Sequence, residues 1–219
     1  MITLIICVRR AAHVTHEYFE SYWRDHHGPL VVGVPEFTRH IRSYRQFHLI
    51  DYHNHADDSE PSKRFDGVAI LSFESAEVMQ TAFQEPRFLS VLEPDTYNFG
   101  DLAHSPQFIV TCADSSEQAA SFHGSITVFE FAGPTTTPAL QFSTKNTLWE
   151  IKPIAVVRYK TIVPDGFDES NQPDPTYITA CSFASVEEAE KILSSTEQAS
   201  PSSVGQRPVH AIAREHVFL

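Results

Sequence analysis

The chain has 219 residues, of which 42% are hydrophobic, so it is long enough to form one large globular domain or two small ones. A formal net charge of −12 argues against binding to phosphate backbones or anionic membrane surfaces, so neither nucleic acid nor membrane is expected as a partner. Only eight glycines are present, which argues against a glycine-rich nucleotide loop.

No apolar segment approaches the roughly 20 residues that a membrane span requires, and the first residues do not resemble a secretion signal. The three cysteines, Cys7, Cys112 and Cys181, are too few and too far apart for a disulfide framework. Each lies in an apolar run, where cysteine behaves as a small hydrophobic residue. We therefore expect a soluble protein in the reducing environment of the cytoplasm.

Elements in the first half are predicted in the order β-α-β-β-α-β. A strand at 2–9 is followed by a helix at 17–26, with Thr15 as its N-cap and Gly28-Pro29 as its end. The remaining predictions are a strand at 37–50, a polar loop at 51–64, a strand at 68–73, a helix at 75–83, an irregular stretch at 87–104 and a strand at 107–112.

The same order begins again after a polar linker at 114–121. We predict strands at 125–131, 154–163, 177–183 and 209–218, a weak helix or irregular crossover at 138–149, a loop at 164–175 and a helix at 186–193. A short match between 72–77 and 182–187 supports a repeat, with Ser75 and Ser185 as N-caps.

These observations predict an α+β fold built from two ferredoxin-like βαββαβ repeats. Residues 1–113 form the repeat with the reactive site, and residues 123–219 form a degenerate, structural repeat. Each four-stranded sheet alone would expose one face, so the two sheets can cover each other and close an intramolecular barrel with the helices outside.

The most promising site lies where the first helix meets the second strand. Phe19, Trp23 and His27 share one helix face, and His27 is predicted to lie at the helix C-terminus. The even positions of the strand place His40, Arg42, Tyr44, Gln46 and His48 on one face. Two interpretations are open: a solvated edge strand, or a pocket with rings for an apolar ligand and imidazoles for proton transfer.

The second half lacks this pattern. Aligning the second strands places Tyr159 opposite Tyr44 and Val163 opposite His48. In the last strand, one face carries His210, Ile212, Arg214 and His216, which we expect to be solvated or between the repeats.

Metal and cofactor sites are not predicted. His53 and His55 lie beside Asp51, Asp57 and Asp58 in a loop without the fixed spacing of known metal sites, so no metal is expected there. Nucleophile elbow, dinucleotide and P-loop motifs are missing, so an enzyme of this sequence would work without an organic cofactor.

Several of these segments together resemble the EthD family of the dimeric α+β barrel superfamily. The resemblance covers residues 1–113 and rests on Phe19-x-x-Tyr22-Trp23-x-x-x-His27-Gly28-Pro29-Leu30, Tyr44-x-x-x-His48, Phe65-Asp66-Gly67, Pro94-Asp95 and Phe99. It implies that His27 and His48 form an acid–base pair and that Tyr44 orients or protonates a substrate oxygen. Tyr22, Trp23 and Phe99 would wall the substrate, with His104 and Asp66 as further candidates for substrate binding.

The resemblance implies a cofactor-independent lyase, cyclase or isomerase of secondary metabolism. Such an enzyme would dehydrate, decarboxylate or cyclise a polyketide-like aromatic or other apolar carbonyl compound, as fungal relatives do. Two alternatives remain: a cofactor-free monooxygenase, whose substrate phenolate itself reduces oxygen, and a non-catalytic binding or accessory protein. Most relatives form the barrel by dimerising, whereas the second repeat here predicts an intramolecular barrel, which leaves a further homodimer open.

Overall fold

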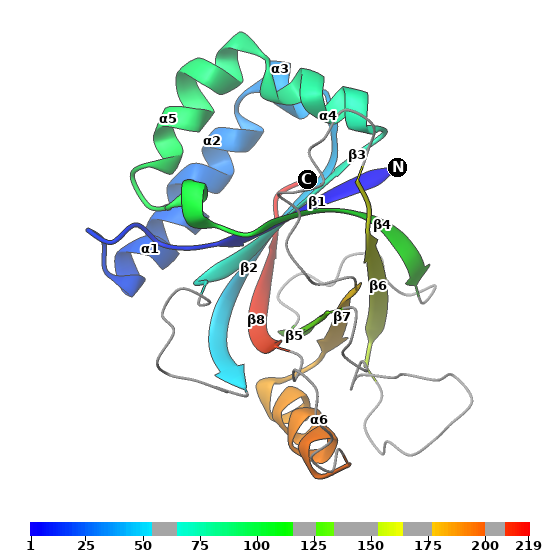
Figure 1. Cartoon of the computed structure of the whole chain (residues 1–219). Helices are drawn as coiled ribbons and strands as arrows, with labels where there is room; N and C mark the ends of the chain where they lie inside the picture. Colours follow the sequence, from blue (N-terminus) through cyan, green and yellow to red (C-terminus); the bar gives the residue numbers. More distant parts are fainter. Residues whose placement is uncertain (54–64, 116–125, 134–152, 164–176, 200–208) are drawn as a thin grey trace.

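The computed structural model describes residues 1–53, 65–115, 126–133, 153–163, 177–199 and 209–219 (Figure 1). Eight antiparallel strands close a barrel in the order β1-β3-β2-β8-β5-β7-β6-β4. The strands are β1 (Ile2–Val8), β2 (Ile41–His53), β3 (Gly67–Phe73), β4 (Gln107–Ser115), β5 (Ile126–Ala132), β6 (Ala155–Thr161), β7 (Tyr177–Phe183) and β8 (Val209–Val217). The expected α+β fold and intramolecular barrel are confirmed.

The strands are apolar on both faces because each face is covered. In β1, Ile5 and Cys7 point into the barrel, whereas Leu4 and Val8 pack beneath the helices on the outside. Alternating residues therefore serve two different cores, and the strand has the near-continuous apolar sequence of a fully buried strand. The barrel interior is filled by residues from both halves, among them Phe47, Val68, Phe108, Phe129, Tyr159 and Ile178.

The two halves repeat the same sheet. The strand order β4-β1-β3-β2 in the first half corresponds to β8-β5-β7-β6 in the second, and β2–β8 and β4–β6 pairing joins the two sheets. A pair of hydroxyls recurs at matching positions. Thr3 Oγ1 lies 3.3 Å from Ser72 Oγ, and Thr127 Oγ1 lies 3.2 Å from Ser182 Oγ.

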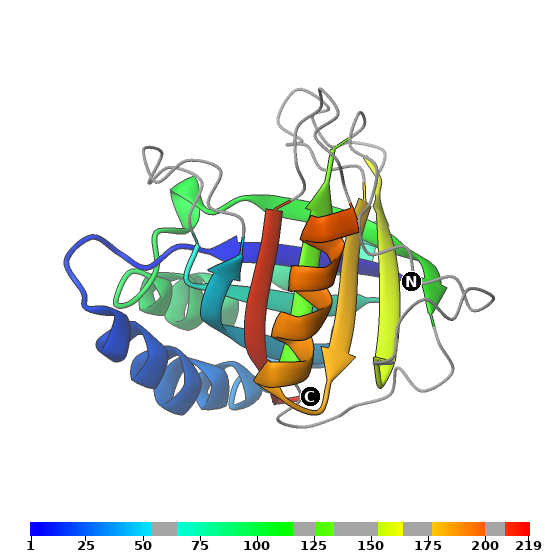
Figure 2. The same cartoon turned by 90° about the horizontal axis from the view of Figure 1, so that it is seen from below.

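Helices cover opposite sides of the barrel (Figure 1). The first half carries α1 (His16–Tyr22), the π-helical turn η1 (Trp23–His27), α2 (Gly28–Val32), α3 (Pro35–Thr38), α4 (Ala76–Phe83), the π-helical turn η3 (Phe88–Leu92), α5 (Glu93–Thr96) and the short 3-10 turn η4 (Leu102–His104). Among the described residues of the second half, α6 (Val186–Ala199) packs against β5 and β7, as Figure 2 shows from below.

The predicted N-caps are confirmed. Thr15 accepts a hydrogen bond from the Tyr18 N–H, Ser75 from the Val78 N–H and Ser185 from the Glu188 N–H.

None of the helices in the described part of the chain is long and apolar enough to cross a membrane.

Several predictions of local structure are wrong. The segment predicted as irregular at 87–104 contains η3, α5 and η4. The second strand begins at Ile41 instead of residue 37, because Pro35 starts the short helix α3, and the strand continues to His53. The fourth strand continues to Ser115, into the expected linker.

The first helix does not end at Gly28-Pro29. The Gly28 N–H bonds to the Trp23 carbonyl five residues back, which widens the turn, and Pro29 then lies in the first turn of α2. A proline is tolerated there because N–H groups in the first turn of a helix have no carbonyl partner within that helix. Its missing N–H therefore costs no hydrogen bond. As a result, His27 lies in the middle of a continuous helical segment and not at its C-terminus.

Most of the predicted linker, the crossover at 138–149 and the loop at 164–175 lie outside the described residues.

Candidate active site

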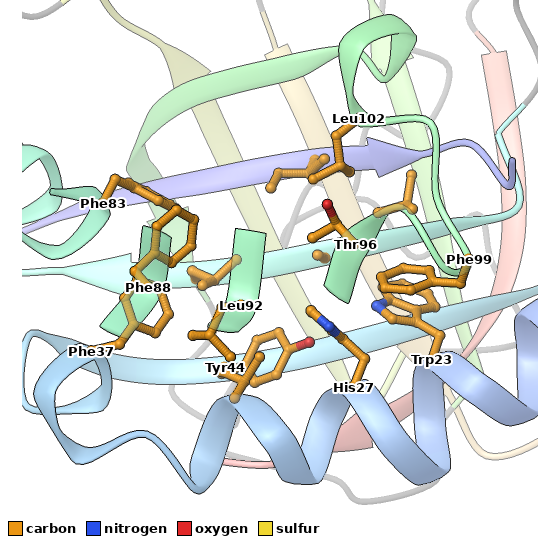
Figure 3. Close-up of a pocket in the computed structure, with 15 residues that line it drawn as sticks. Trp23, His27, Phe37, Tyr44, Phe83, Phe88, Leu92, Thr96, Phe99 and Leu102 are labelled. Carbon is orange, nitrogen blue, oxygen red and sulfur yellow. The ribbon is translucent and has the colours of Figure 1, made fainter. Parts of the chain in front are cut away.

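A cavity of about 80 Å³ lies between the outer face of the first-half sheet and its helices (Figure 3). Helix and strand residues together line it: Ile6, Val8, Trp23, His27, Val31, Phe37, Tyr44, Ala69, Leu71, Phe83, Phe88, Leu92, Thr96, Phe99 and Leu102. Apart from His27, Tyr44 and Thr96, these side chains are apolar or carry only the Trp23 indole N–H. The cavity therefore favours an uncharged, apolar ligand that offers few polar groups.

Small residues on β3 make room for the aromatic wall. A Cβ atom at Gly67 would lie 2.3 Å from a ring carbon of Trp23 and 3.0 Å from the Phe47 carbonyl oxygen. Only glycine lets the indole pack against the strand at this point. Trp23 in turn stacks with Phe99 at a ring-centroid distance of 6.3 Å, and His27 lies 4.7 Å from the same Phe99 ring.

His27 and Asp95 form a nearly buried pair. The Nδ1 atom of His27 lies 2.8 Å from Oδ2 of Asp95, and the two side chains are 10% and 12% exposed. His27 comes from η1 and Asp95 from α5, so the pair joins the two helical segments that flank the cavity. Because a carboxylate only accepts hydrogen bonds, Nδ1 carries the proton and Nε2 is left for the cavity.

Asp95 is held in its ionised form. Burial opposes ionisation, but the hydrogen bonds from His27 and Tyr22 outweigh it and lower the pKa of the Asp95 carboxyl. The Tyr22 hydroxyl donates to Oδ1 of Asp95 over 2.7 Å. Burial and this carboxylate raise the pKa of Tyr22 to about 12. Tyr22 therefore holds Asp95 in place and does not line the cavity.

Tyr44 reaches the cavity from β2, and in Figure 3 its hydroxyl points toward the His27 ring. Burial raises the pKa of the Tyr44 phenol, against smaller opposing effects of Gln46 and Trp23. Tyr44 is therefore a neutral hydrogen-bond donor at physiological pH.

The other end of the chain supports Tyr44. Its backbone bonds with Phe218 and Leu219, and the Phe218 ring stacks on its ring at 5.4 Å. Phe218 also fills the space beside Gly28, where a Cβ atom would lie 2.2 Å from a ring carbon of Phe218.

His48 does not line the cavity, although sequence analysis paired it with His27. Its ring lies behind Trp23 at a centroid distance of 4.6 Å. The Nε2 atom is 3.1 Å from Oε1 of Gln46, and Nδ1 is 3.1 Å from Oε1 of Glu20. The expected acid–base pair of two histidines is therefore not assembled in this cavity, because His48 packs against Trp23 and lies outside the cavity lining.

Asp66 and His104 lie away from the cavity as well. Asp66 accepts a hydrogen bond from the Arg10 N–H over 3.0 Å and forms an ion pair with the Arg10 side chain, so it shapes the chain before β3. His104 is exposed and pairs with Asp101 at 2.9 Å. Of the eight predicted site residues, the cavity brings together Trp23, His27, Tyr44 and Phe99.

The structure resolves the question of whether this strand face is solvated. Tyr44, Gln46 and His48 are all buried, so the solvated-edge interpretation is wrong for these positions. Sequence analysis missed two partners, Asp95 and Gln46. Pro94-Asp95 belongs to the recognised motif and Gln46 to the even face of the strand, but neither was expected to bond with His27 or Tyr44.

The alignment with the second half also needs correction. Tyr44 pairs with Leu71 as Val156 pairs with Cys181, and His48 pairs with Gly67 as Lys160 pairs with Tyr177. Tyr159 therefore corresponds to Phe47, and both face the barrel interior. His210, expected to be solvated or between the repeats, is buried on the outer face of the second-half sheet beside Glu130.

Among the described residues, no group of three or more His, Cys, Asp or Glu side chains could hold a metal ion. His55, Asp57 and Asp58 of the predicted acidic loop lie outside the described part of the chain, and Asp51 and His53 belong to β2.

The fold and the cavity define an eight-stranded α+β barrel protein with an apolar pocket and a buried Asp–His pair. The family model described as the EthD domain matches residues 11–103, the part that carries most of the pocket. This match agrees with the resemblance to the EthD family that the sequence motifs of residues 1–113 indicate.

A solved structure of an anthrone oxidase-like protein is similar to this chain. Its TM-score is 0.58 at 11% sequence identity, and the match covers 99% of this chain and 92% of the other. That likeness supports the fold. A structure described as a putative chlorite dismutase matches 97% of this chain and 94% of that protein's chain at 7% identity. Its TM-score of 0.48 is too low to support a conclusion. No match was found among curated proteins.

Proposed function

We propose that the protein is a cofactor-independent enzyme that removes a proton from an apolar carbonyl or phenolic compound and so drives its dehydration, cyclisation or isomerisation. The proposal rests on one observation: a base and a hydrogen-bond donor, each held in place by neighbouring residues, lie together in an apolar pocket. His27 is held by Asp95, and Tyr44 points its hydroxyl toward the His27 ring (Figure 3). Decarboxylation is less favoured, because the pocket lining contains no Arg or Lys to hold a carboxylate.

His27 acts as the base in the first step. Its Nε2 atom takes a proton from a carbon next to the substrate carbonyl, and the electron pair of that C–H bond moves onto the carbonyl oxygen. The resulting imidazolium is stabilised by the Asp95 carboxylate at 2.8 Å. Tyr44, neutral and buried, donates a hydrogen bond to the enolate oxygen.

The second step of a dehydration returns the same proton. The enolate reforms the carbonyl, a carbon–carbon double bond forms, and the bond to the β-hydroxyl breaks. The His27 imidazolium protonates the departing hydroxide to water and becomes neutral again. One histidine therefore suffices as base and acid, which agrees with the position of His48 outside the pocket.

The pocket walls favour a flat, uncharged substrate. Trp23, Phe88 and Phe99 present aromatic rings, which suits the polyketide-like aromatics that the family resemblance implies. The cavity of about 80 Å³ is roughly half of the ~150 Å³ that holds benzene in an engineered protein. Wall side chains such as Phe88 must therefore move when a substrate enters.

A second candidate function is cofactor-free oxygenation. The same base would deprotonate a phenol, and the electron-rich anion would transfer electrons to O₂ within the apolar pocket. A similar solved structure is described as anthrone oxidase-like, which favours this candidate at the level of fold. An assay without oxygen separates the two, because dehydration or isomerisation continues there and oxygenation stops.

The cytoplasmic location and the further homodimer expected from the sequence remain predictions. Size-exclusion chromatography with light scattering measures the second directly.

The proposal is tested by comparing two histidine variants on a panel of β-hydroxyketones and fused-ring phenols. His27→Ala should lower kcat/KM by about 10² to 10⁴, the range for loss of a general acid or base. His104→Ala, an exposed histidine outside the pocket, should leave kcat/KM unchanged. Full activity of folded His27→Ala, or ligand binding without turnover of any compound by the wild type, would favour a binding or accessory protein instead.

A further inference from the structure

A tyrosine hydroxyl both donates and accepts hydrogen bonds, so its use in a pocket depends on where its proton points. We propose that Gln46 is a positioning residue that fixes the direction of the Tyr44 O–H bond into the pocket, and that His48 in turn fixes Gln46. The catalytic meaning of this inference rests on the function proposed above, but the hydrogen-bond arrangement itself does not.

Gln46 determines which role Tyr44 plays. Its side chain is fully buried, and its Nε2 atom lies 2.6 Å from the Tyr44 oxygen and 3.0 Å from the Trp23 carbonyl oxygen. An amide nitrogen carries two hydrogens and only donates. Both hydrogens are used here, so the Tyr44 oxygen accepts one of them and its own proton must point elsewhere.

The neighbours of the Gln46 amide are compatible with only one of its two orientations. A carbonyl oxygen such as that of Trp23 only accepts, so the nitrogen of the amide must face it. Rotating the amide by 180° would bring two acceptor oxygens together within a buried site, which is costly. The Trp23 carbonyl group in η1 therefore fixes the orientation of the Gln46 amide. The amide in turn fixes the direction of the Tyr44 O–H bond.

His48 completes the arrangement from the other side. Its Nε2 atom lies 3.1 Å from Oε1 of Gln46, and that oxygen can only accept, so Nε2 carries a proton. Its Nδ1 atom lies 3.1 Å from a Glu20 carboxylate oxygen, close enough for an ion pair when the ring is charged. The pKa of the neighbouring His216 is lowered to about 4 by burial and by His48, so His216 stays neutral.

The chain of contacts thus runs from Glu20 through His48 and Gln46 to Tyr44, and only its last member reaches the pocket. In the second half, the corresponding positions carry Lys160, Arg158 and Val156. The second half has no phenol to orient at this place, because Val156 stands at the position of Tyr44.

The test reverses the polarity at Gln46 with little change in shape. In Gln46→Glu, the carboxylate accepts the Tyr44 proton and turns it away from the pocket. The readout is the ¹³Cζ resonance of Tyr44 in protein labelled at its tyrosine rings, assigned by its loss in Tyr44→Phe. We expect this resonance to move downfield, toward the phenolate position. Gln107→Glu makes the same change at an exposed position of β4 and should leave the resonance in place.

A second variant covers the case in which a buried carboxylate prevents folding. Gln46→Met keeps the size but donates nothing, so the Tyr44 oxygen loses its donor and the ¹³Cζ resonance should move downfield, by less than in Gln46→Glu. In Gln46→Glu the Tyr44 oxygen loses the same donor and its proton is also drawn to an acceptor, so the larger downfield shift of that variant reports the direction of the Tyr44 O–H bond. An unchanged or upfield-shifted resonance in Gln46→Met, or a shift in folded Gln46→Glu no larger than that in Gln46→Met, would overturn the inference.

These measurements need no substrate, so they separate the inference from the proposed function. If the ¹³Cζ shifts are as expected but His27→Ala keeps full activity, the positioning of Tyr44 stands and the proposed chemistry fails. If His27→Ala loses activity and the resonance does not respond to Gln46, the reverse holds.

Discussion

The outer faces of the two half-sheets are built on the same frame but filled differently. In the first half, β3 presents Gly67 and Ala69 at positions where β7 presents Tyr177 and Thr179. The small residues leave space for Trp23 and for the cavity. The pocket therefore depends on a few small side chains and is not a general property of the barrel.

The second half buries a contact between a glutamate and a histidine where the first half keeps an apolar wall. Glu130 occupies the position that corresponds to Ile6, which lines the cavity, and His210 the position that corresponds to Gln107. The Nε2 atom of His210 lies 3.1 Å from a Glu130 carboxylate oxygen, and both side chains are buried. An equivalent face can thus enclose a cavity in one repeat and hold internal polar contacts in the other.

The largest effect is expected from breaking this buried contact. Glu130→Ala should lower the free energy of unfolding by about 3–5 kcal/mol, because it leaves a buried polar partner behind. Ligand binding in the first-half pocket should be unaffected in the folded fraction. Urea unfolding measures the loss, with Glu187→Ala, an exposed partner of Lys191, as the control that leaves stability nearly unchanged. A loss below about 1 kcal/mol in Glu130→Ala would contradict this role.

The next effect tests the space that β3 leaves for Trp23. Gly67→Ala should cost about 1–3 kcal/mol, because the new Cβ atom would overlap a buried indole that has little freedom to move. Gly100→Ala is the matched control, since its Cβ would meet its nearest neighbour at 3.5 Å. Chemical unfolding of both variants gives the comparison. Equal stabilities would show that Trp23 adapts easily.

A smaller effect depends on pH. The lowered pKa of Asp95 means that its ionised form stabilises the folded state above the unfolded pKa of about 3.9, and that this stability is lost as the pH falls through the folded pKa. Asp95→Asn should therefore be about 1–2 kcal/mol less stable than the wild type at pH 6–7. The difference should shrink below about pH 4. Unfolding curves at several pH values check this, with the exposed Glu36→Gln as the control. A difference independent of pH would contradict the assignment.

The smallest effect compares the two repeats directly. Ser75 and Ser185 cap equivalent helices, with N–H to Oγ distances of 3.3 and 3.2 Å. Replacing either with alanine should cost about 1 kcal/mol in thermal or urea unfolding. A clear inequality between the two would show that the helices contribute differently to the cooperative fold.

The barrel was predictable because its information is local and repeated. Each strand is a short apolar run between polar segments, and the serine caps mark both equivalent helices. The continuation of the first helix was not predictable, since Gly28-Pro29 is a normal stop signal. Only the wider turn that joins the Gly28 N–H to the Trp23 carbonyl makes it compatible with a helix.

The site was predictable as a set of residue types but not as a set of partners. Helical spacing placed Trp23 and His27 on one face, and alternation placed Tyr44 with His48 on one strand face. Neither pattern tells that His48 packs against Trp23 outside the cavity. The pairing of His27 with Asp95 depends on contact between distant segments, one of which looked irregular because of its prolines.

Barrel closure has a consequence for how the protein is made. Tyr44 is hydrogen-bonded to and stacked with Phe218, so the pocket wall is supported by a residue that the ribosome adds long after the wall itself. Until then, β2 and β4 remain open strand edges, ready to pair with other chains. Contacts this distant in sequence form late and slow the folding of a protein. The nascent first half thus exposes two unpaired strand edges until the second half joins it, and the wall of the cavity at Tyr44 is among the last features to form.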